Sequence, residues 1–324
     1  MFPSFDLGPL AFPSYFTLLM LGFLAAIFLG AQVAHRIGVD ANHVLDAGIW
    51  AVVFGIVGSR ALHVVADGYF MDYVHLCTDS TQVEPKKLPG ERPCTSDQQC
   101  VTADRGEICA VDRGTCHPAR DCLRAFKFWY GGLTYYGGFL AAAIFLYFYV
   151  RRLGYPVWRF ADIPGFAVPL GLVFGRIGCY LSGCCFGNRS DSWLAVVFPK
   201  DSPAYTEQAK AHLLGAHAHE SLAVLPTQLY ESAGTLLVFL VCFWMYLRRR
   251  TYDGKVFWWF VLLYAVLRFV VEIWRGDQRG EWVFGLLSTS QAIALPCILV
   301  ALIMLPRLKR RSPPLHELPD APKA

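Results

Sequence analysis

Seven apolar stretches of the chain are long enough, or nearly so, to cross the hydrocarbon core of a bilayer, which is about 30 Å thick. They are residues 13–34, 46–66, 132–150, 163–182, 227–247, 256–274 and 286–305. Each approaches the roughly 20 residues that a spanning helix needs, and polar segments separate them. The pattern therefore predicts an all-α membrane protein with seven transmembrane helices.

Arginine and lysine residues beside these segments predict their orientation, because short loops rich in these residues stay on the cytoplasmic side. No lysine or arginine precedes Arg36. If the N-terminus lies outside, every basic cluster next to a predicted helix is cytoplasmic. These clusters are Arg36, Arg151–Arg152, Arg248–Arg250 with Lys255, and Arg307 with Lys309–Arg311. We therefore expect the N-terminus outside and the C-terminus in the cytoplasm.

Composition supports the same class of protein. The chain is 55% hydrophobic and 17% charged, which is too apolar for an ordinary soluble domain. Its net charge of +4 comes mainly from the basic clusters beside the helices. Because this charge reflects topology, and no separate basic patch is present in the sequence, we expect no nucleic-acid partner.

Residues 70–127 interrupt the apolar pattern and contain six cysteines among proline, glycine and charged residues. The cysteines are Cys77, Cys94, Cys100, Cys109, Cys116 and Cys122. A polar segment this small cannot bury enough apolar surface to fold unaided, so we expect a disulfide framework outside the cell. A zinc site is the alternative, which the lack of a C-x-x-C pair disfavours. The sequence does not fix the pairing.

This insert divides the chain into four predicted parts. They are helices 1 and 2 at residues 1–69, the cysteine-rich extracytoplasmic insert at 70–127, helices 3 to 7 at 128–306 with an outer arm at 188–225, and a cytoplasmic tail at 307–324. The tail is basic and then proline-rich, which is typical of a disordered segment.

Arg60, Arg176 and Arg268 lie inside predicted helices, and Arg275 lies at the end of one. An arginine buried in a bilayer costs about 2.5–3.5 kcal/mol, so it needs an internal partner or an anionic ligand. A polar stripe follows one face of the sixth helix and consists of Tyr264, Arg268, Glu272 and Arg275. Ion pairing with Glu272 is one interpretation, and extension to the headgroups is an alternative for Arg60. Because few acids accompany the arginines, we expect them to bind a phosphate.

Glycine-rich segments accompany these arginines. The stretch F-G-R-I-G-C-Y-L-S-G-C-C-F-G-N at 174–188 sets Arg176 among small residues that let helices approach closely. The stretch 129–139 carries Gly-Gly pairs on both sides of Tyr135 and Tyr136, a poor start for a helix. Irregular backbone at membrane depth lines a cavity or is buried in protein. We interpret both stretches as walls of a lipid headgroup pocket, with an aromatic belt as the alternative for the second.

Other polar residues lie close to the predicted pocket. Gln228, Glu231 and Ser232 share one face of the fifth helix because of their spacing. Tyr15, near the outer end of the first helix, is either an interfacial anchor or a site residue. Three cysteines follow Arg176 in sequence: Cys179, Cys184 and Cys185. They either pack as small apolar side chains or serve a thiol-redox function in an electropositive setting.

These residues together resemble the pattern of the bacterial prolipoprotein diacylglyceryl transferases. The matching motifs are Tyr15 in the first helix, S-R ending at Arg60, Y-G-G-F at 136–139, G-R-I-G at 175–178 running to Gly187, P-T-Q-L-Y-E at 226–231 and R-F-V-V-E at 268–272. They occur in the family's order and span nearly the whole chain except the insert and the tail. P-T-Q-L-Y-E together with G-R-I-G is fairly specific, and the family's seven-helix, N-outside arrangement agrees with the apolar pattern.

The resemblance implies transfer of a diacylglyceryl group from phosphatidylglycerol to the lipobox cysteine thiol of a prolipoprotein signal peptide, at the bacterial inner (plasma) membrane. It implies catalytic roles for Arg176, Arg268, Tyr136 and Glu272. It implies substrate binding by Tyr15, Arg60, Gly137, Gly138, Gly187, Gln228, Tyr230, Glu231 and Arg275. No metal and no organic cofactor are required. The partners are then phosphatidylglycerol, the prolipoprotein and the bilayer.

Three positions depart from the family's usual residues. Tyr136 stands where the family has histidine, Cys179 where it has asparagine, and Leu225 where it has histidine. A tyrosine, with a pKa near 10, is a poorer proton acceptor than imidazole. A catalytically weakened relative that binds lipid or lipoprotein is therefore one alternative function. A membrane thiol-redox protein using Cys179, Cys184 and Cys185 is another.

Overall fold

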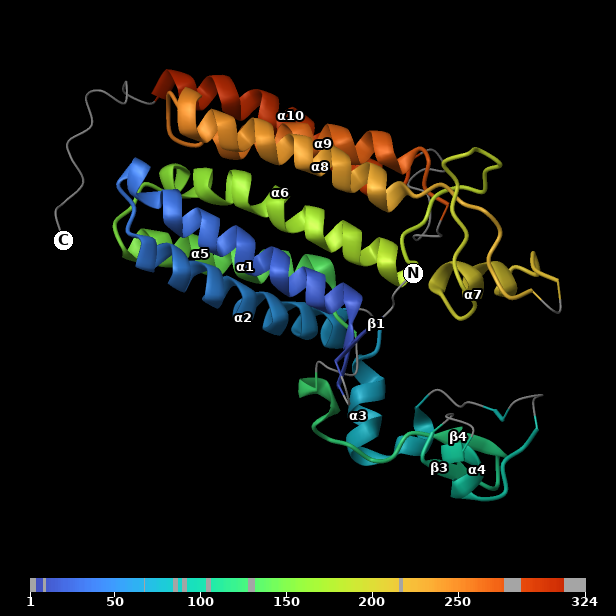
Figure 1. Ribbon diagram of the computed structural model, residues 1–324. Coiled ribbons are helices and arrows are strands. Elements are labelled where there is room, and N and C mark those ends of the chain that lie inside the picture. Colours follow the sequence, from blue (N-terminus) through green and yellow to red (C-terminus); the bar gives the residue numbers. More distant parts are fainter. Residues whose placement is uncertain are drawn as a thin grey trace. The chain divides into compact units, whose positions relative to one another are not determined.

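Figure 1 shows the computed structural model, which describes residues 4–7, 10–66, 68–83, 87–88, 92–102, 106–127, 132–215, 218–276 and 287–311. The chain divides into two compact units. The larger unit comprises Met1–Leu45 and Val150–Ala324, and the smaller unit comprises Asp46–Tyr149.

Each of the seven predicted segments coincides with a helix. The helices are α1 (Ser14–Ala34), α2 (Ala41–Ala66), α5 (Tyr135–Arg152), α6 (Val157–Ser182), α8 (Thr227–Trp244), α9 (Lys255–Glu272) and α10 (Thr289–Arg311). Among the described residues, five of these helices are long and apolar enough to span a bilayer: α1, α2, α6, α8 and α10. Helices α5 and α9 have 18 residues each and are not among the five. The chain is thus mostly helical, with several candidate membrane spans.

Short elements precede or follow two of the long helices in the larger unit. Strands β1 (Ser4–Leu7) and β2 (Leu10–Pro13) form an antiparallel pair before α1. A 3-10 turn, η1 (His35–Ile37), follows α1, and a π-helical turn, η5 (Met245–Arg249), follows α8.

Helix α6 is the centre of the larger unit, because it packs against α1, α8 and α9, while α10 packs against α9 (Figure 1). Glycines allow these close approaches. A Cβ on Gly22 of α1 would lie 2.8 Å from the carbonyl oxygen of Gly171 of α6. A Cβ on Gly165 of α6 would lie 2.8 Å from the Cα of Phe257 of α9. The core between these helices is therefore narrow, and backbone approaches backbone.

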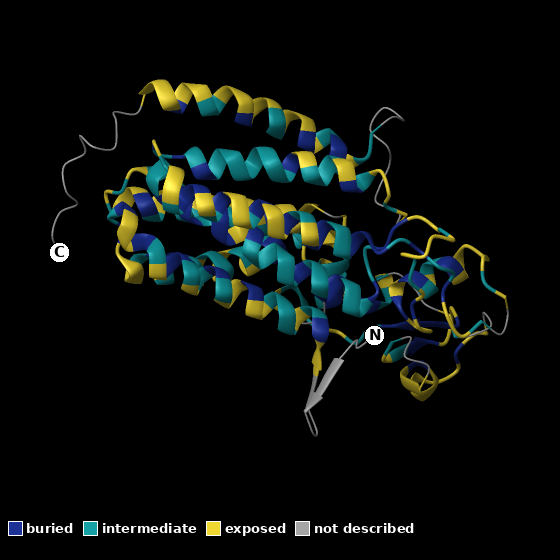
Figure 2. Ribbon diagram, turned by 45° about the horizontal axis from the view of Figure 1, so that its top comes forward, coloured by how far each residue is buried: buried dark blue, intermediate teal, exposed yellow. Residues whose placement is uncertain are grey.

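Large hydrophobic side chains are exposed on the outer helix faces of the larger unit (Figure 2). They include Phe16, Met20, Leu24 and Phe28 on α1, Leu237 and Leu240 on α8, and Leu299 and Leu302 on α10. A soluble protein rarely leaves apolar stripes of this length in water. The pattern is that of helices whose outer faces contact lipid.

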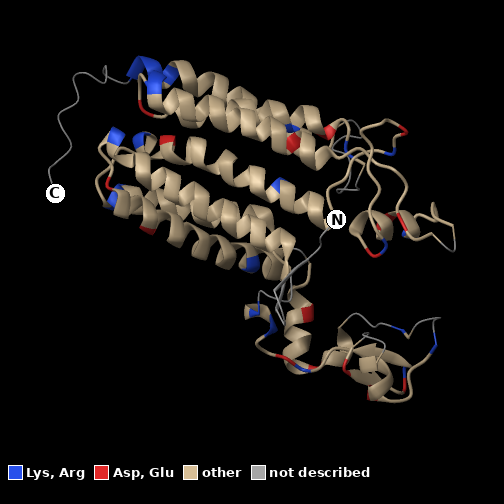
Figure 3. Ribbon diagram, viewed as in Figure 1, with Lys and Arg blue, Asp and Glu red and all other residues tan. Residues whose placement is uncertain are grey.

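Figure 3 shows lysine and arginine gathered at one end of the long helices of the larger unit. Asp162 of α6 is fully buried at this end. Its carboxylate accepts hydrogen bonds from the backbone N–H groups of Val256 (2.9 Å) and Phe257 (3.1 Å), and from Arg250 Nε (2.9 Å). One side chain of α6 thus satisfies the first amide groups of α9. The apolar pattern did not predict this contact, because it placed Asp162 just outside the fourth span.

The outer arm at 188–225 folds back on itself around helix α7 (Pro203–Lys210). Val196 and Val224 exchange backbone hydrogen bonds, and Ser221 N donates to Phe198 O (2.9 Å). Phe198 and Val224 belong to a buried cluster with Phe186 and Ala204. The arm therefore has a small apolar core of its own.

In the smaller unit, α2 and α5 meet through glycines. A Cβ on Gly58 would lie 2.6 Å from the carbonyl oxygen of Gly137, and a Cβ on Gly138 would lie 3.0 Å from that of Gly55. We expected irregular backbone at the second Gly-Gly pair, and this is wrong, because α5 begins at Tyr135 and includes Gly137 and Gly138. The helical propensity that two glycines forfeit is offset by the close packing that they allow.

The six cysteines of the insert form three disulfides: Cys77–Cys122, Cys94–Cys109 and Cys100–Cys116. The predicted disulfide framework is therefore confirmed, and the zinc alternative is wrong for these residues. The surrounding elements are α3 (Phe70–Thr78), η2 (Ser80–Gln82), α4 (Asp97–Thr102), β3 (Ile108–Ala110), β4 (Thr115–His117) and η3 (Arg124–Phe126). Cys94, Cys100, Cys109 and Cys116 form the buried core of this segment.

Candidate functional site

A buried ion pair joins α6 to α8 in the larger unit. Arg176 Nη2 lies 2.9 Å from Glu231 Oε1, and the Glu231 side chain is only 1% exposed. Tyr264 of α9 donates its hydroxyl to the same carboxylate oxygen at 3.2 Å. Glu231 is thus contacted from α6 and α9, which agrees with its predicted place on the polar face of the fifth predicted helix.

Helix α9 and the turn that follows it bring two more arginines to this carboxylate. Arg268 Nη1 and Arg275 Nη1 each lie 3.9 Å from Glu231 Oε2. Arg268 Nη2 also lies 2.7 Å from Glu272 Oε2, and Arg275 Nε lies 4.0 Å from the same oxygen. The predicted polar stripe of α9 therefore faces α6 and α8. We call Arg176, Glu231, Arg268, Glu272 and Arg275 the arginine cluster.

Three buried polar atoms of the arginine cluster have no hydrogen-bond partner among the described residues: Arg268 Nη1, Glu231 Oε2 and Glu272 Oε2. Glu272 Oε2 is held by its ion pair with Arg268 Nη2, so Arg268 Nη1 and Glu231 Oε2 are the two to explain. Their separation of 3.9 Å is too long for a hydrogen bond between them. A buried polar atom without a partner costs about 1–3 kcal/mol, so such atoms are uncommon outside functional sites. A donor and an acceptor thus lie side by side, buried and unused.

Charge in the cluster is uneven. Three guanidinium groups contact two carboxylates within it. When they are buried, the two carboxylates fix the orientation of the guanidinium groups that they bind. The excess of guanidinium groups favours the binding of an anion. The arrangement is suited to hold a phosphate and to stabilise charge that develops on it.

The loop after α6 positions the last arginine of the cluster. Gly187 pairs with Arg275 in an isolated antiparallel bridge, and Asn188 N donates to Trp274 O at 2.8 Å. A Cβ on Gly187 would lie 2.7 Å from the oxygens of both Leu225 and Trp274. Gly187 is therefore needed for close backbone contact, which in turn places Arg275.

Three other predicted residues lie on α8 and α1. Gln228 Nε2 donates to Cys184 O at 2.7 Å, whereas its Oε1 atom is buried without a partner among the described residues. Tyr230 is half-buried and follows on α8. Tyr15 of α1 lies against Gly178 of α6, where an added Cβ would be 3.4 Å from the Tyr15 ring. Tyr15 and Gln228 thus lie near the end of α6 that follows Arg176.

The remaining predicted residues belong to the smaller unit. Arg60 donates to the carbonyl oxygens of Ala125 (2.8 Å), Arg124 (2.6 Å) and Gly132 (3.2 Å). It is 7% exposed, so it is buried in protein. Tyr136 is exposed, and Gly137 and Gly138 pack against α2.

Sequence reasoning did not include Ser290 in the site. Its hydroxyl accepts a hydrogen bond from Arg268 Nη2 at 3.0 Å. The available signal was the sequence S-T-S-Q at 288–291, in which Ser288 and Gln291 form reciprocal N-terminal caps of α10. That cap fixes the start of α10 and thereby places Ser290 beside Arg268.

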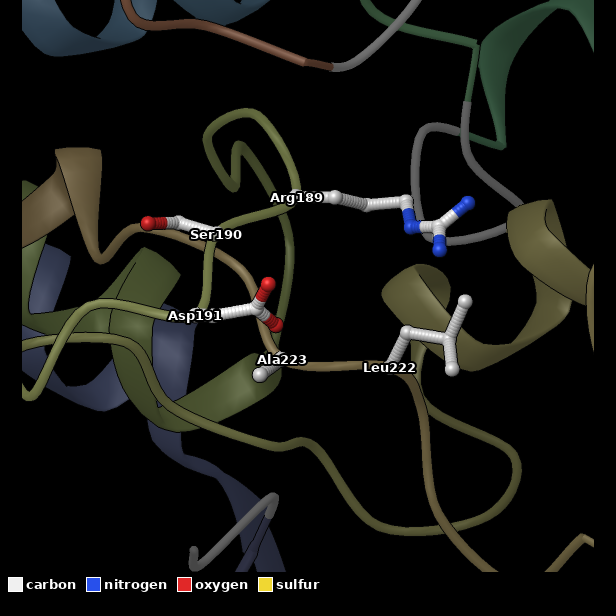
Figure 4. A pocket seen from close by; sticks show the side chains of 5 residues that line it. All are labelled: Arg189, Ser190, Asp191, Leu222 and Ala223. Atoms are coloured by element: carbon white, nitrogen blue, oxygen red, sulfur yellow. The ribbon is translucent and has the colours of Figure 1, made fainter.

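The outer arm carries a separate hollow of about 290 Å³, shown in Figure 4. Its lining residues are Arg189, Ser190, Asp191, Leu222 and Ala223. None of them belongs to the arginine cluster. The two charged side chains, Arg189 and Asp191, make its rim polar.

Comparison with known proteins relates this geometry to a family. The family model of prolipoprotein diacylglyceryl transferase matches residues 3–83 and 115–307. The chain belongs to this family. The matched part contains every residue of the arginine cluster, and it leaves out residues 84–114, which hold Cys94, Cys100 and Cys109.

Relatives named phosphatidylglycerol–prolipoprotein diacylglyceryl transferase are similar over most of the chain. One from Thermus thermophilus is 31% identical and covers 94% of this chain and 96% of its own length. One from Clostridium tetani is 26% identical, covering 93% and 94%. One from Xanthomonas euvesicatoria is 33% identical, covering 62% and 69%. The predicted family resemblance is therefore confirmed.

Proposed function

We propose that this protein transfers the diacylglyceryl group of phosphatidylglycerol to the cysteine thiol of a prolipoprotein. Family membership and the names of the relatives support this reaction. The observation in the structure that carries the proposal is the unused pair of atoms, Arg268 Nη1 and Glu231 Oε2, within the arginine cluster.

In this reaction the thiol sulfur forms a bond to the terminal glycerol carbon of the diacylglyceryl group. The bond between that carbon and the phosphate oxygen breaks, glycerol phosphate leaves with the electron pair, and the thiol proton is released. Negative charge therefore grows on the leaving phosphate. Arg176 and Arg268 are placed to stabilise this charge, and Arg275 to position the phosphate.

The headgroup of phosphatidylglycerol presents both groups that the cluster lacks. A phosphate oxygen accepts from Arg268 Nη1, and a glycerol hydroxyl donates to Glu231 Oε2. A lipid with an ammonium headgroup would instead bring a cation toward three guanidinium groups. We thus assign the exclusion of ammonium headgroups to the three guanidinium groups, the contact with the glycerol hydroxyl to Glu231 and the phosphate contact to Arg268. Glu272, whose carboxylate lies 2.7 Å from Arg268 Nη2, orients that guanidinium.

The other predicted residues keep their proposed roles. Tyr15, Arg60, Gly137, Gly138, Gly187, Gln228 and Tyr230 contribute to substrate binding, and Tyr136 acts in thiol deprotonation. The fact that Arg60 donates to three backbone carbonyls supports a positioning role for it within its own unit.

We further propose seven spanning helices in the bacterial inner membrane, with the N-terminus outside. In this arrangement the 18-residue helices α5 and α9 also span the membrane, in addition to the five candidate spans. The gathering of basic residues at one end of the larger unit supports a cytoplasmic position for that end (Figure 3).

The test compares Arg268→Lys with Arg159→Lys in purified protein supplied with labelled phosphatidylglycerol and a lipobox peptide. Arg159 also pairs with a carboxylate, Asp253, at 3.2 Å, but lies outside the arginine cluster. We expect Arg268→Lys to lower kcat/KM for transfer by about 100-fold or more, because lysine cannot make two directed contacts. Arg159→Lys should retain transfer. Unchanged transfer in Arg268→Lys would contradict the proposal.

A second candidate function is lipid binding without transfer, which Tyr136 in place of histidine favours. The same experiment separates it from the first. Retention of labelled phosphatidylglycerol by the unsubstituted protein, without any transfer to the peptide, would support this second function.

A further inference from the structure

Three thiols converge at the end of α6, beside the arginine cluster. Cys179 lies in the last turn of the helix, and Cys184 and Cys185 lie in the loop that follows. Their Sγ atoms all lie within 4.8 Å of one another. Neither the fold nor the proposed transfer reaction requires three sulfur atoms at this place.

Backbone conformation brings these sulfurs together. Gly183 and Cys185 adopt left-handed conformations, with φ of 74° and 63°. Cys184 N donates to Cys179 O at 3.1 Å, so the loop turns back over the end of the helix. A non-glycine residue in this conformation is uncommon and costs about 1–3 kcal/mol. Cys185 keeps it because the loop is held in place.

Neighbouring residues hold the loop from α8. Thr227 Oγ1 donates to Cys185 O at 3.0 Å, and Gln228 Nε2 donates to Cys184 O at 2.7 Å. Cys179 is buried, and Cys184 and Cys185 are half-buried, so the group is largely shielded and still reachable. A preformed arrangement of this kind lowers the entropy that a ligand must overcome on binding.

We propose that Cys179, Cys184 and Cys185 bind one thiophilic metal ion, with Cu(I) as the preferred ion. Among the described residues, no histidine nitrogen and no carboxylate oxygen joins the three sulfurs. A donor set of sulfur alone selects soft ions, and three thiolates satisfy Cu(I), whereas Zn²⁺ is almost always four-coordinate. Each thiol releases its proton to solvent as the ion binds.

Charge around the site agrees with this assignment. Three thiolates around one Cu(I) ion carry a net charge of −2. Arg176 lies close enough to interact electrostatically with Cys179 and Cys185. A nearby guanidinium favours thiolates, whereas burial opposes them, so the thiols lose their protons only as the ion binds. The metal site and the arginine cluster therefore share Arg176 without sharing ligands.

The test uses full-length protein in detergent with its disulfides intact. Under anaerobic conditions the protein is titrated with Cu(I) in competition with a chromogenic Cu(I) chelator. We expect one ion per chain, with a first shell of sulfur only by X-ray absorption. Cys297→Ser provides the control, because Cys297 is half-buried on α10, outside the three disulfides, and not part of the group. The variant with serine at all three cysteines should lose this ion.

The triple variant could lose the ion because it misfolds, so a single substitution and a labelling experiment on unsubstituted protein test the site separately. We expect Cys184→Ser to weaken Cu(I) binding by more than about 100-fold. In unsubstituted protein, Cu(I) should protect these three cysteines, but not Cys297, from maleimide labelling read by mass spectrometry. Absence of a bound ion, retention of it after all three substitutions, or preference for Zn²⁺ over Cu(I) would each overturn the proposal. Diacylglyceryl transfer is not used in this test, so its outcome is independent of the proposed enzyme activity.

Discussion

Glu231 is the residue at which the three arginines of the cluster meet. Its side chain is 1% exposed, and its two oxygens lie within 4.0 Å of guanidinium groups from α6 and from the α9 segment. Removing one carboxylate from such a site leaves buried cations facing one another. Residues of this kind hold their surroundings together as well as contacting ligand.

We predict that Glu231→Gln lowers the free energy of unfolding by about 3–5 kcal/mol, because a broken buried ion pair leaves its partner charge uncompensated. Denaturant unfolding of detergent-solubilised protein measures this. Transfer from phosphatidylglycerol should also fall, because a neutral amide binds the arginines more weakly than a carboxylate does and no longer fixes their direction. A variant as stable as the parent protein would show that Glu231 does not balance the arginines.

Gly187 allows a second test at single-residue scale. A Cβ there would lie 2.7 Å from Leu225 O, Thr227 Cγ2 and Trp274 O. We predict that Gly187→Ala destabilises the protein by about 1–3 kcal/mol and shifts Arg275 away from Glu231, so that transfer falls. Gly215→Ala is the matched control, because nothing lies within 4 Å of a Cβ at that position. Equal stability and activity of the two variants would refute this role for Gly187.

Among the elements, α6 has the largest structural role, because it packs against three other helices and carries both Arg176 and Asp162. At one end Asp162 binds the first amides of α9 and Arg250. Further along α6, Arg176 binds Glu231 of α8. The spacing of the two charged residues along α6 thus holds α8 and α9 in register.

We predict that Asp162→Ala destabilises the protein by about 3–5 kcal/mol, because it leaves Arg250 Nε and the amide groups of Gly254, Val256 and Phe257 without their acceptor. Thermal unfolding measured by circular dichroism reports the change. Asp112→Ala is the control, since Asp112 also pairs with an arginine but on the surface, where pairs contribute about 0–1 kcal/mol. Similar losses in both variants would argue against a special role for the buried pair.

Much of the arrangement of elements could be predicted from sequence. The hydrophobic pattern located the seven long helices that the described residues form, and the polar stripe at 264–275 identified the side that faces Glu231. The pattern could not reveal contacts between distant segments, such as Asp162 with α9 or Ser290 with Arg268. It also failed at Gly137 and Gly138, because propensity alone ignores the close packing that glycine allows.

The insert shows a different limit. Cysteine count and polarity predicted disulfides, but their pairing depended on the folded backbone, in which β3 sets Cys109 opposite Cys116 of β4 while each bonds to a different partner. Residues 84–114 also lie outside the part that matches the family. The core of the insert is therefore an addition that the shared reaction does not explain.

At the scale of the whole molecule, the basic residues and the disulfides favour the same orientation in the membrane. The last turns of α10 and of the helix that extends α8 carry basic residues, and Lys255 at the start of α9 donates to Arg249 O. These groups gather at one end of the larger unit (Figure 3). Basic residues favour the cytoplasm, whereas disulfides persist outside it.

We therefore predict that a green fluorescent protein fused after residue 311 is fluorescent, and that alkaline phosphatase inserted at residue 88 is active, because the phosphatase needs an oxidising compartment. Exchanging the two reporters provides the control, and both signals should then be lost. The opposite pattern would mean that the basic clusters lie outside. The orientation matters for the reaction, since a prolipoprotein that has already crossed the membrane must then reach the arginine cluster.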